Sequence, residues 1–241
     1  CDLLKPYSNF DWVSAQGLNG PIFALIALDT RESYKTAYKD TREKCIKHIL
    51  DKQLSDGGWD LSAGKADPDM TAMAIQALAP YYKTNETVKA AVDKALEALS
   101  ALQRNDGGFG SWGTVNSESC AQVIVALTAL GIDPTADSRF VKNDLTVLDA
   151  LASFYVTGGG FKHVADKDRD GMATEQGYYA LAAYYRLTAS KTSLYDMSDV
   201  TITVTPDQPA TPDQPAKPDA PRTGDESPVL VWMGMAAMAG A

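Results

Sequence analysis

One short acidic stretch carries the clearest metal-binding pattern in this sequence. DKDRDG places Asp166, Asp168 and Asp170 at the alternating spacing of a calcium loop. Position twelve of an EF-hand loop needs a bidentate Glu, and Gly177 stands there instead. Three carboxylates can still hold calcium weakly in an extracellular setting, while a solvated turn explains the same residues. The sequence therefore predicts no firm metal site and leaves a weak calcium site open.

Cysteine and histidine offer little further chemistry. The three cysteines, Cys1, Cys45 and Cys120, cannot form a closed disulfide framework, and no Cys-x-x-Cys occurs. Neither of the two histidines falls on a predicted inner helix, because His48 lies on a half-exposed helical run and His163 follows a glycine turn. No phosphate loop, Ser-His-Asp arrangement or metalloprotease helix is present.

Net charge excludes one class of partner. The 241 residues carry a formal net charge of -9 at pH 7. An acidic chain gains nothing from the release of phosphate counterions, so we expect no binding to nucleic acid.

The remaining acidic side chains are positioned by helical runs, which repeat along the sequence. Almost wholly apolar runs alternate with runs that have one charged face, at a period of about 50 residues. No strand-like alternation occurs before VTITVT at 200–205. This pattern predicts an all-α fold of helical hairpins in two layers, with the apolar helices inside. The apolar runs are 18–30, 69–82, 118–131 and 173–188, and the half-exposed runs are 40–54, 86–103 and 139–155.

A glycine-rich turn recurs after each half-exposed run. Gln-x-x-Asp-Gly-Gly-aromatic occurs twice, 50 residues apart, and YVTGGGF follows with Tyr155 in the Gln position. The glycine pair is expected to adopt positive φ and reverse the chain, the aromatic ring to fill the gap between hairpins, and the Gln side chain to bond helix-end carbonyls. We interpret this motif as structural. Its residues are Gln53, Gly57, Gly58, Trp59, Gln103, Gly107, Gly108, Phe109, Gly159, Gly160 and Phe161.

This repeat resembles the prenyltransferase and squalene-oxidase repeat. GLNGPIFALIALDT, ADPDMTAMAIQALAPYY and ESCAQVIVALTALGIDP are most similar to bacterial secreted proteins of that superfamily. The resemblance covers about residues 1–198 and implies an α/α toroid, a fold shared by terpenoid cyclases, protein prenyltransferases, thioester domains and cobalamin carriers. With about seven helices, this chain is expected to form a partial toroid with an open inner face, its other helices lying upstream of Cys1.

The resemblance also implies where a ligand meets the fold, namely at the starts of the inner helices. Capping of those helices explains most of the side chains found there, and ligand binding is the alternative role. The candidate ligand-binding residues are Asp67, Asp69, Glu118, Cys120, Glu175, Gln176 and Tyr179.

Catalytic members of the superfamily need residues that this chain only partly supplies. A class II terpene cyclase uses Asp-x-Asp-Asp, and ADPDM ends in Met70. A protein prenyltransferase binds zinc through Asp-x-Cys and a distant His, which Glu118-Ser119-Cys120 imitates without a histidine on an inner helix. Cys120 is therefore predicted to be a small buried hydrophobic residue. A thioester needs Cys-x-x-Gln, and Gln122 stands one residue too early.

The last quarter of the chain changes composition. TPDQPATPDQPAKPDAP at 205–221 favours an extended spacer without a core. APRTGDE resembles the Leu-Pro-x-Thr-Gly sorting signal of Gram-positive surface proteins, with Ala220 in the Leu position and a short apolar run after it. The resemblance implies that a sortase cleaves after Thr223 and joins it covalently to peptidoglycan. The sorting residues are Pro221, Thr223 and Gly224.

These observations predict three segments: a partial toroid at 1–198, a Pro-rich linker at 199–219 and a truncated sorting signal at 220–241. They favour an extracellular, wall-anchored, non-catalytic protein without a cofactor. Its inner face would bind a small hydrophobic or corrinoid-like ligand or a surface partner. A terpenoid cyclase or prenyltransferase-like enzyme is the alternative.

Overall fold

The computed structural model describes residues 3–62, 64–196 and 198–200. The chain divides into two units, Cys1–Asp199 and Val200–Ala241. The spacer, the sorting residues and nearly all of the predicted strand at 200–205 therefore lie outside the described residues. Within these residues no helix is both long and apolar enough to cross a bilayer.

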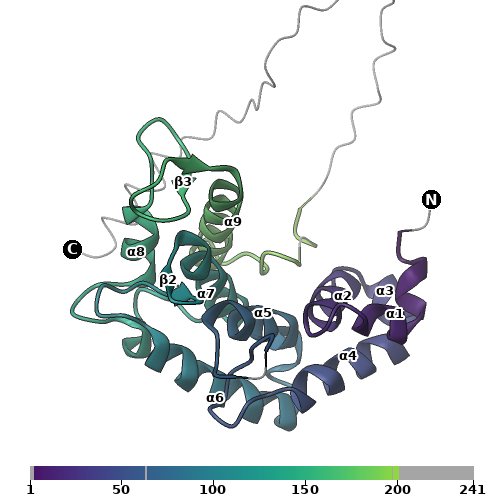
Figure 1. Cartoon of the computed structure of the whole chain (residues 1–241). Helices are drawn as coiled ribbons and strands as arrows, with labels where there is room; N and C mark the ends of the chain where they lie inside the picture. The colour runs from purple at the N-terminus through teal and green to yellow at the C-terminus, as the bar shows by residue number, and fades with distance from the viewer. Residues whose placement is uncertain (1–2, 63, 197, 201–241) are drawn as a thin grey trace, which may run out of the picture. The chain divides into compact units, whose positions relative to one another are not determined.

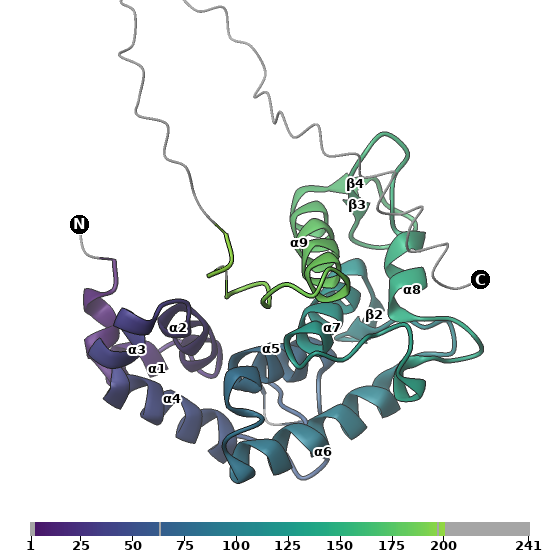
Figure 2. The same ribbon diagram turned by 180° about the vertical axis from the view of Figure 1, so that it is seen from behind.

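Four helices form the inner layer, and each packs against the next (Figures 1 and 2). α5 and α7 are buried on most sides because their residues are almost all apolar or small. The four inner helices are α2 (Asn19–Asp29), α5 (Pro68–Leu78), α7 (Ser117–Ala129) and α9 (Gly171–Thr188). The predicted burial is confirmed for α5 and α7, whereas α2 and α9 are buried along one side only.

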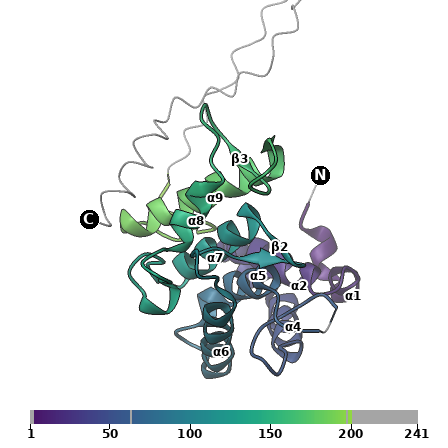
Figure 3. The ribbon, with the colours of Figure 1, turned by 60° about the vertical axis from the view of Figure 1, so that its left-hand side comes forward.

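Three helices form the outer layer: α4 (Lys39–Asp51), α6 (Glu86–Leu102) and α8 (Val147–Ser153). α4 packs on α2, α6 on α5 and α8 on α7. Figure 3 shows α4 and α6 on one side of α2 and α5. The arrangement is the predicted all-α partial toroid. Shorter elements of the described chain are α1 (Phe10–Ser14), α3 (Glu32–Ala37), and the 3-10 turns η1 (Lys5–Ser8), η2 (Ala79–Tyr81) and η3 (Ser138–Phe140).

The third outer helix is shorter than the predicted run at 139–155. Thr146 caps α8 and forms a capping box with Asp149, so the helix begins after it. The residues before the cap make a tight turn in which Asn143 and Asp144 have φ of 52° and 62°. Local cap chemistry therefore overrides the helical spacing of Val141, Leu145 and Leu148.

Short hairpins are the second departure from the prediction. β1 (Gly110–Ser111) pairs with β2 (Thr114–Val115), and β3 (Phe161–Lys162) pairs with β4 (Arg169–Asp170). Each hairpin lies between a glycine turn and the next inner helix, which places two-residue strands where no strand was expected.

In the first two glycine turns, the two glycines of each pair have different structural roles. Gly57 and Gly107 adopt φ of 94° and 78°, as predicted for the turn. Gly58 has no positive φ, and glycine is needed there because a β-carbon would lie 2.3 Å from the Ala66 β-carbon. The expected positive φ is therefore confirmed, and in these two turns it falls on the first glycine of each pair and not on Gly58 or Gly108.

The Gln side chains tie each turn to the following hairpin. Gln53 Nε2 donates to the carbonyls of Gly57 and Ala91, both at 2.7 Å. Gln103 Nε2 donates to the carbonyls of Gly107 and Phe140, at 2.9 and 2.8 Å. The Gln side chains do bond backbone carbonyls, but the predicted acceptors were wrong: one bond stays inside the turn and the other reaches the next repeat, and neither goes to the end of the preceding outer helix. The aromatic rings Trp59, Phe109 and Phe161 are fully buried, as expected.

Candidate functional site

The inner helices begin at polar residues that act as caps. Asp67 Oδ1 accepts hydrogen bonds from the backbone N–H groups of Asp69 and Met70, both at 3.0 Å. Asn116 and Asp170 cap α7 and α9 in the same way. Capping thus explains Asp67 but not Asp69, Glu118 or Glu175, whose side chains cap no helix.

The carboxyl group of Asp69 is held in an unfavourable setting. Burial raises its pKa to about 6. The hydroxyls of Ser119 and Ser111 oppose this shift, whereas the charges of Asp67 and Glu118 reinforce it. Asp69 Oδ1 and Ser119 Oγ are both buried and neither forms a hydrogen bond of ordinary length within the described part of the chain, although the Ser119 hydroxyl is close enough to the Asp69 carboxyl to lower its pKa. A buried acceptor without a well-formed hydrogen bond is costly, so this point of the structure favours a group that can donate.

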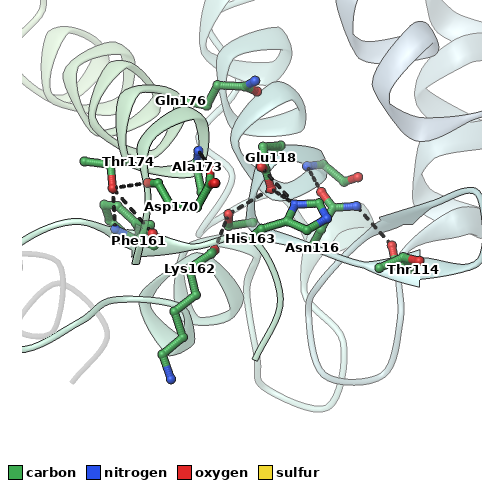
Figure 4. Close-up of polar contacts among 12 residues, drawn as sticks. Thr114, Asn116, Glu118, Phe161, Lys162, His163, Asp170, Ala173, Thr174 and Gln176 are labelled. Atoms are coloured by element: carbon green, nitrogen blue, oxygen red, sulfur yellow. Dashed lines mark hydrogen bonds and ion pairs between the residues drawn. The ribbon is translucent and has the colours of Figure 1, made fainter. Parts of the chain in front are cut away.

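Glu118 forms an ion pair that the sequence analysis missed. His163 Nδ1 lies 2.9 Å from the Glu118 carboxylate (Figure 4). The Glu118 side chain is 12% exposed and that of His163 is 50% exposed. The Ser117 backbone N–H and hydroxyl donate to the carbonyls of His163 and Lys162, which fixes the loop against α7. His163 lies outside the inner helices, as predicted, but its contact with the start of α7 was not foreseen.

The candidate metal ligands do not come together. Among the described residues no three His, Cys, Asp or Glu side chains are placed to hold a metal ion. Cys120 is fully buried, and burial raises its pKa to about 12, so its thiol is a packing group as predicted. In the calcium-like stretch, Asp170 caps α9 by accepting from the Ala173 N–H at 2.8 Å, while Asp166 and Asp168 are exposed.

Three glutamines form a hydrogen-bonded chain across the inner layer. Gln76 of α5 donates through Nε2 to Gln122 Oε1 at 2.9 Å, and Gln122 of α7 donates to Gln176 Oε1 of α9 at 3.0 Å. Gln176 lies above Glu118 and His163 in Figure 4. Only Gln176 was among the predicted site residues. These hydrogen bonds join one side-chain amide from each of the three inner helices α5, α7 and α9.

Tyr179 and Glu175 extend this polar surface along α9. Burial raises the pKa of Tyr179, and the nearby groups Tyr195, Glu175, Asp69 and Glu118 raise it further. Three of the predicted site residues, Asp69, Glu118 and Glu175, therefore lie within electrostatic reach of Tyr179. Other α9 tyrosines have structural roles, since the Tyr178 hydroxyl accepts from the Gly160 N–H at 3.2 Å.

A segment after α9, which we call the strap (residues 192–196), lies over part of the inner side. Arg186 is buried and holds the strap by donating from Nε to the Thr192 carbonyl at 2.7 Å and by pairing with Asp199. The strap is the light green segment after α9 in Figures 1 and 2. Its residues 193–196 border a cavity of about 310 Å³. Its other walls come from α2, α5 and α7 and include Ile26, Gln76 and Val125.

The strap thus borders part of the inner face, which the sequence predicts to be open. None of the seven predicted site residues lines the cavity, and Gln76 alone joins the cavity to the glutamine chain. The surface has two parts: acidic helix starts at one end and a small cavity nearer the other ends of α2 and α5.

Comparisons with known proteins add little beyond the fold. No family model matches the sequence, and no curated protein matches it. Among solved structures, Candida albicans protein geranylgeranyltransferase-I complexed with GGPP is similar, with a TM-score of 0.48 and 17% sequence identity. The similarity covers 70% of this chain and 49% of that chain, so this chain spans about half the length of its neighbour.

Proposed function

We propose that this chain belongs to a wall-anchored, non-catalytic surface protein of a Gram-positive bacterium whose helical domain binds a small ligand on its inner layer. The observation that carries the proposal is the buried pair Asp69 Oδ1 and Ser119 Oγ, neither of which forms a hydrogen bond of ordinary length with a described residue. A ligand bearing N–H or O–H donors would satisfy these atoms.

The surrounding groups favour a polar edge on that ligand. The glutamine chain offers amide groups that pair with other amides, since each carries donors and acceptors. A corrinoid-like ligand, with carboxamides around a flat ring, fits this chemistry better than an isoprenoid chain, which would leave the same groups unpaired.

Catalysis has weaker support. The elevated pKa of Asp69 is the one feature that favours a proton-donating enzyme. The sequence has Met70 where an Asp-x-Asp-Asp motif needs its third acid, and Cys120 faces the core rather than joining Glu118 and His163. These residues favour binding over cyclisation or prenyl transfer.

Ligand binding can be tested with hydroxocobalamin and equilibrium dialysis of the full chain. We expect saturable binding that Gln122→Leu weakens by about tenfold or more, because loss of a paired amide breaks contacts to both neighbours. Glu97→Ala, an exposed change on outer helix α6, serves as the control and should bind as wild type. Equal binding by Gln122→Leu would contradict the proposed surface. Turnover of geranylgeranyl diphosphate by the wild-type protein would favour the enzyme instead.

The wall anchor is proposed from the sequence alone. Pro221, Thr223 and Gly224 stand between the Pro-rich spacer and an apolar run, in the order of a sorting signal. We expect Thr223→Ala to move the protein from the wall fraction into the culture medium, because the acyl-enzyme bond to sortase forms at this residue. Fractionation followed by immunoblotting measures the change, and Thr211→Ala in the spacer is the control. Wall attachment of Thr223→Ala would refute the anchor.

A further inference from the structure

Trp112 occupies an unusual backbone position at the tip of the β1–β2 hairpin. The strands pair Gly110 with Val115 and Ser111 with Thr114, which leaves Trp112 and Gly113 as the two loop residues. Their φ angles are 51° and 78°. Positive φ at both central residues is the pattern of a type I′ turn, which Asn-Gly fills best.

Tryptophan is a poor choice for this position on folding grounds. A bulky side chain resists positive φ, and Asn or Asp tolerates it at lower cost. Burial does not compensate, because Trp112 is 77% exposed. Strain of this kind persists where a side chain serves another purpose.

The hairpin holds Trp112 firmly beside the candidate site. The Ser111 hydroxyl donates to Asp67 Oδ2, which joins β1 to the cap of α5. Asn116 Nδ2 donates to the Thr114 carbonyl at 3.0 Å and also caps α7. The hairpin whose tip carries Trp112 is thus attached to the starts of α5 and α7, where the Asp67 and Asp69 carboxylates lie.

The other repeats place exposed apolar side chains at related positions. Leu61 lies in the segment that leads into α5 and is 52% exposed, and Met172 lies at the start of α9 and is 65% exposed. A single exposed apolar residue has no special meaning. One such residue stands before α5, one before α7 and one in the first turn of α9, so each of these helix starts carries an exposed apolar side chain close to it in the sequence.

We propose that Trp112 is a contact residue of the binding surface and stacks on a flat apolar face of the ligand, while donors on the ligand's edge meet the carboxylates at the helix starts. This inference rests on the proposed function and narrows the ligand to a rigid, planar molecule with N–H or O–H groups at its rim. An aromatic face supplies a large contact area with little loss of side-chain entropy.

Substitution by Asn separates this role from folding, because Asn is the residue that the turn prefers. In the full chain, we expect Trp112→Asn to unfold at the same temperature as wild type or higher, and to bind hydroxocobalamin about tenfold more weakly or worse. Trp112→Phe should retain part of the affinity. Trp12→Asn removes another half-exposed tryptophan, on α1, and should leave binding unchanged.

Three results would count against the inference. A lower unfolding temperature for Trp112→Asn would show that the indole serves the fold. Equal affinity of Trp112→Asn and wild type would overturn the role of Trp112 and leave the proposed function standing. Absence of binding by the wild-type protein would overturn the proposed function and this inference with it.

Discussion

Gly107→Ala is expected to lower the free energy of unfolding by about 3–4 kcal/mol, the sum of backbone strain at positive φ and a forced local shift. The φ of Gly107 is 78°, and a β-carbon there would lie 2.4 Å from the Thr146 carbonyl oxygen. That carbonyl belongs to the cap of α8, so relief of the clash must move the capping box or the turn. Urea unfolding followed by circular dichroism measures the loss.

Gly113→Ala is the matched control for this effect. Gly113 has the same φ of 78° but no atom within 4 Å of the added β-carbon. Gly113→Ala should therefore lower the free energy of unfolding by only about 1–2 kcal/mol, the cost of backbone strain at positive φ. Equal losses in the two variants would show that the close approach between the turn and α8 does not contribute to stability.

Periodicity was sufficient to predict the layers of the fold. The inner helices α5 and α7 are apolar around most of their circumference, and α6 alternates charged and apolar residues, so the burial of these helices could be assigned from the sequence. The structural role of the turn motif could also be predicted, because a Gln followed by a glycine pair at the end of a helix, as at Gln103 and Gly107, is typical of a chain reversal. The exact division of labour between Gly57 and Gly58 could not, since it depends on how closely Ala66 approaches.

Local capping limited the prediction of α8. The spacing of Val141, Leu145 and Leu148 fits a helix, but Thr146 and Asp149 form a stronger start signal inside that run. A Thr-x-x-Asp pattern was visible in the sequence, and giving it more weight than the apolar spacing would have placed the helix correctly.

The site was harder to predict because its parts come from distant repeats. Asp69 and Glu118 were identified from their places at helix starts, but the bond between Gln76 and Gln122 joins residues 46 positions apart. Glutamine within an apolar helix was the available signal, since a buried amide needs a partner. The pairing of His163 with Glu118 depends on the β3–β4 hairpin, which is too short to leave a strand pattern.

Asp69→Asn is expected to stabilise the protein at neutral pH by about 2–3 kcal/mol, since each unit of pKa shift corresponds to about 1.4 kcal/mol. The folded-state pKa of Asp69 is raised from 3.8 to about 6, so the folded protein binds this proton more tightly than the unfolded chain. Stability from this group is full below about pH 4 and is lost as pH rises through about 6. Asparagine does not ionise, so Asp69→Asn avoids this loss of stability at neutral pH. In acid, where Asp69 is protonated, the variant should be no more stable than wild type. Urea unfolding at a series of pH values measures the difference.

Asp60→Asn provides a control of opposite sign. Asp60 is nearly fully solvated, and its hydrogen bond from Ser62 lowers its pKa, so its carboxylate favours the folded state at neutral pH. Asp60→Asn should therefore not stabilise the protein there. A gain for Asp69→Asn that persists below pH 4 would contradict the buried carboxyl as its source. If the gain appears only above that range and is accompanied by weaker ligand binding, the free energy spent on burying Asp69 serves recognition rather than folding.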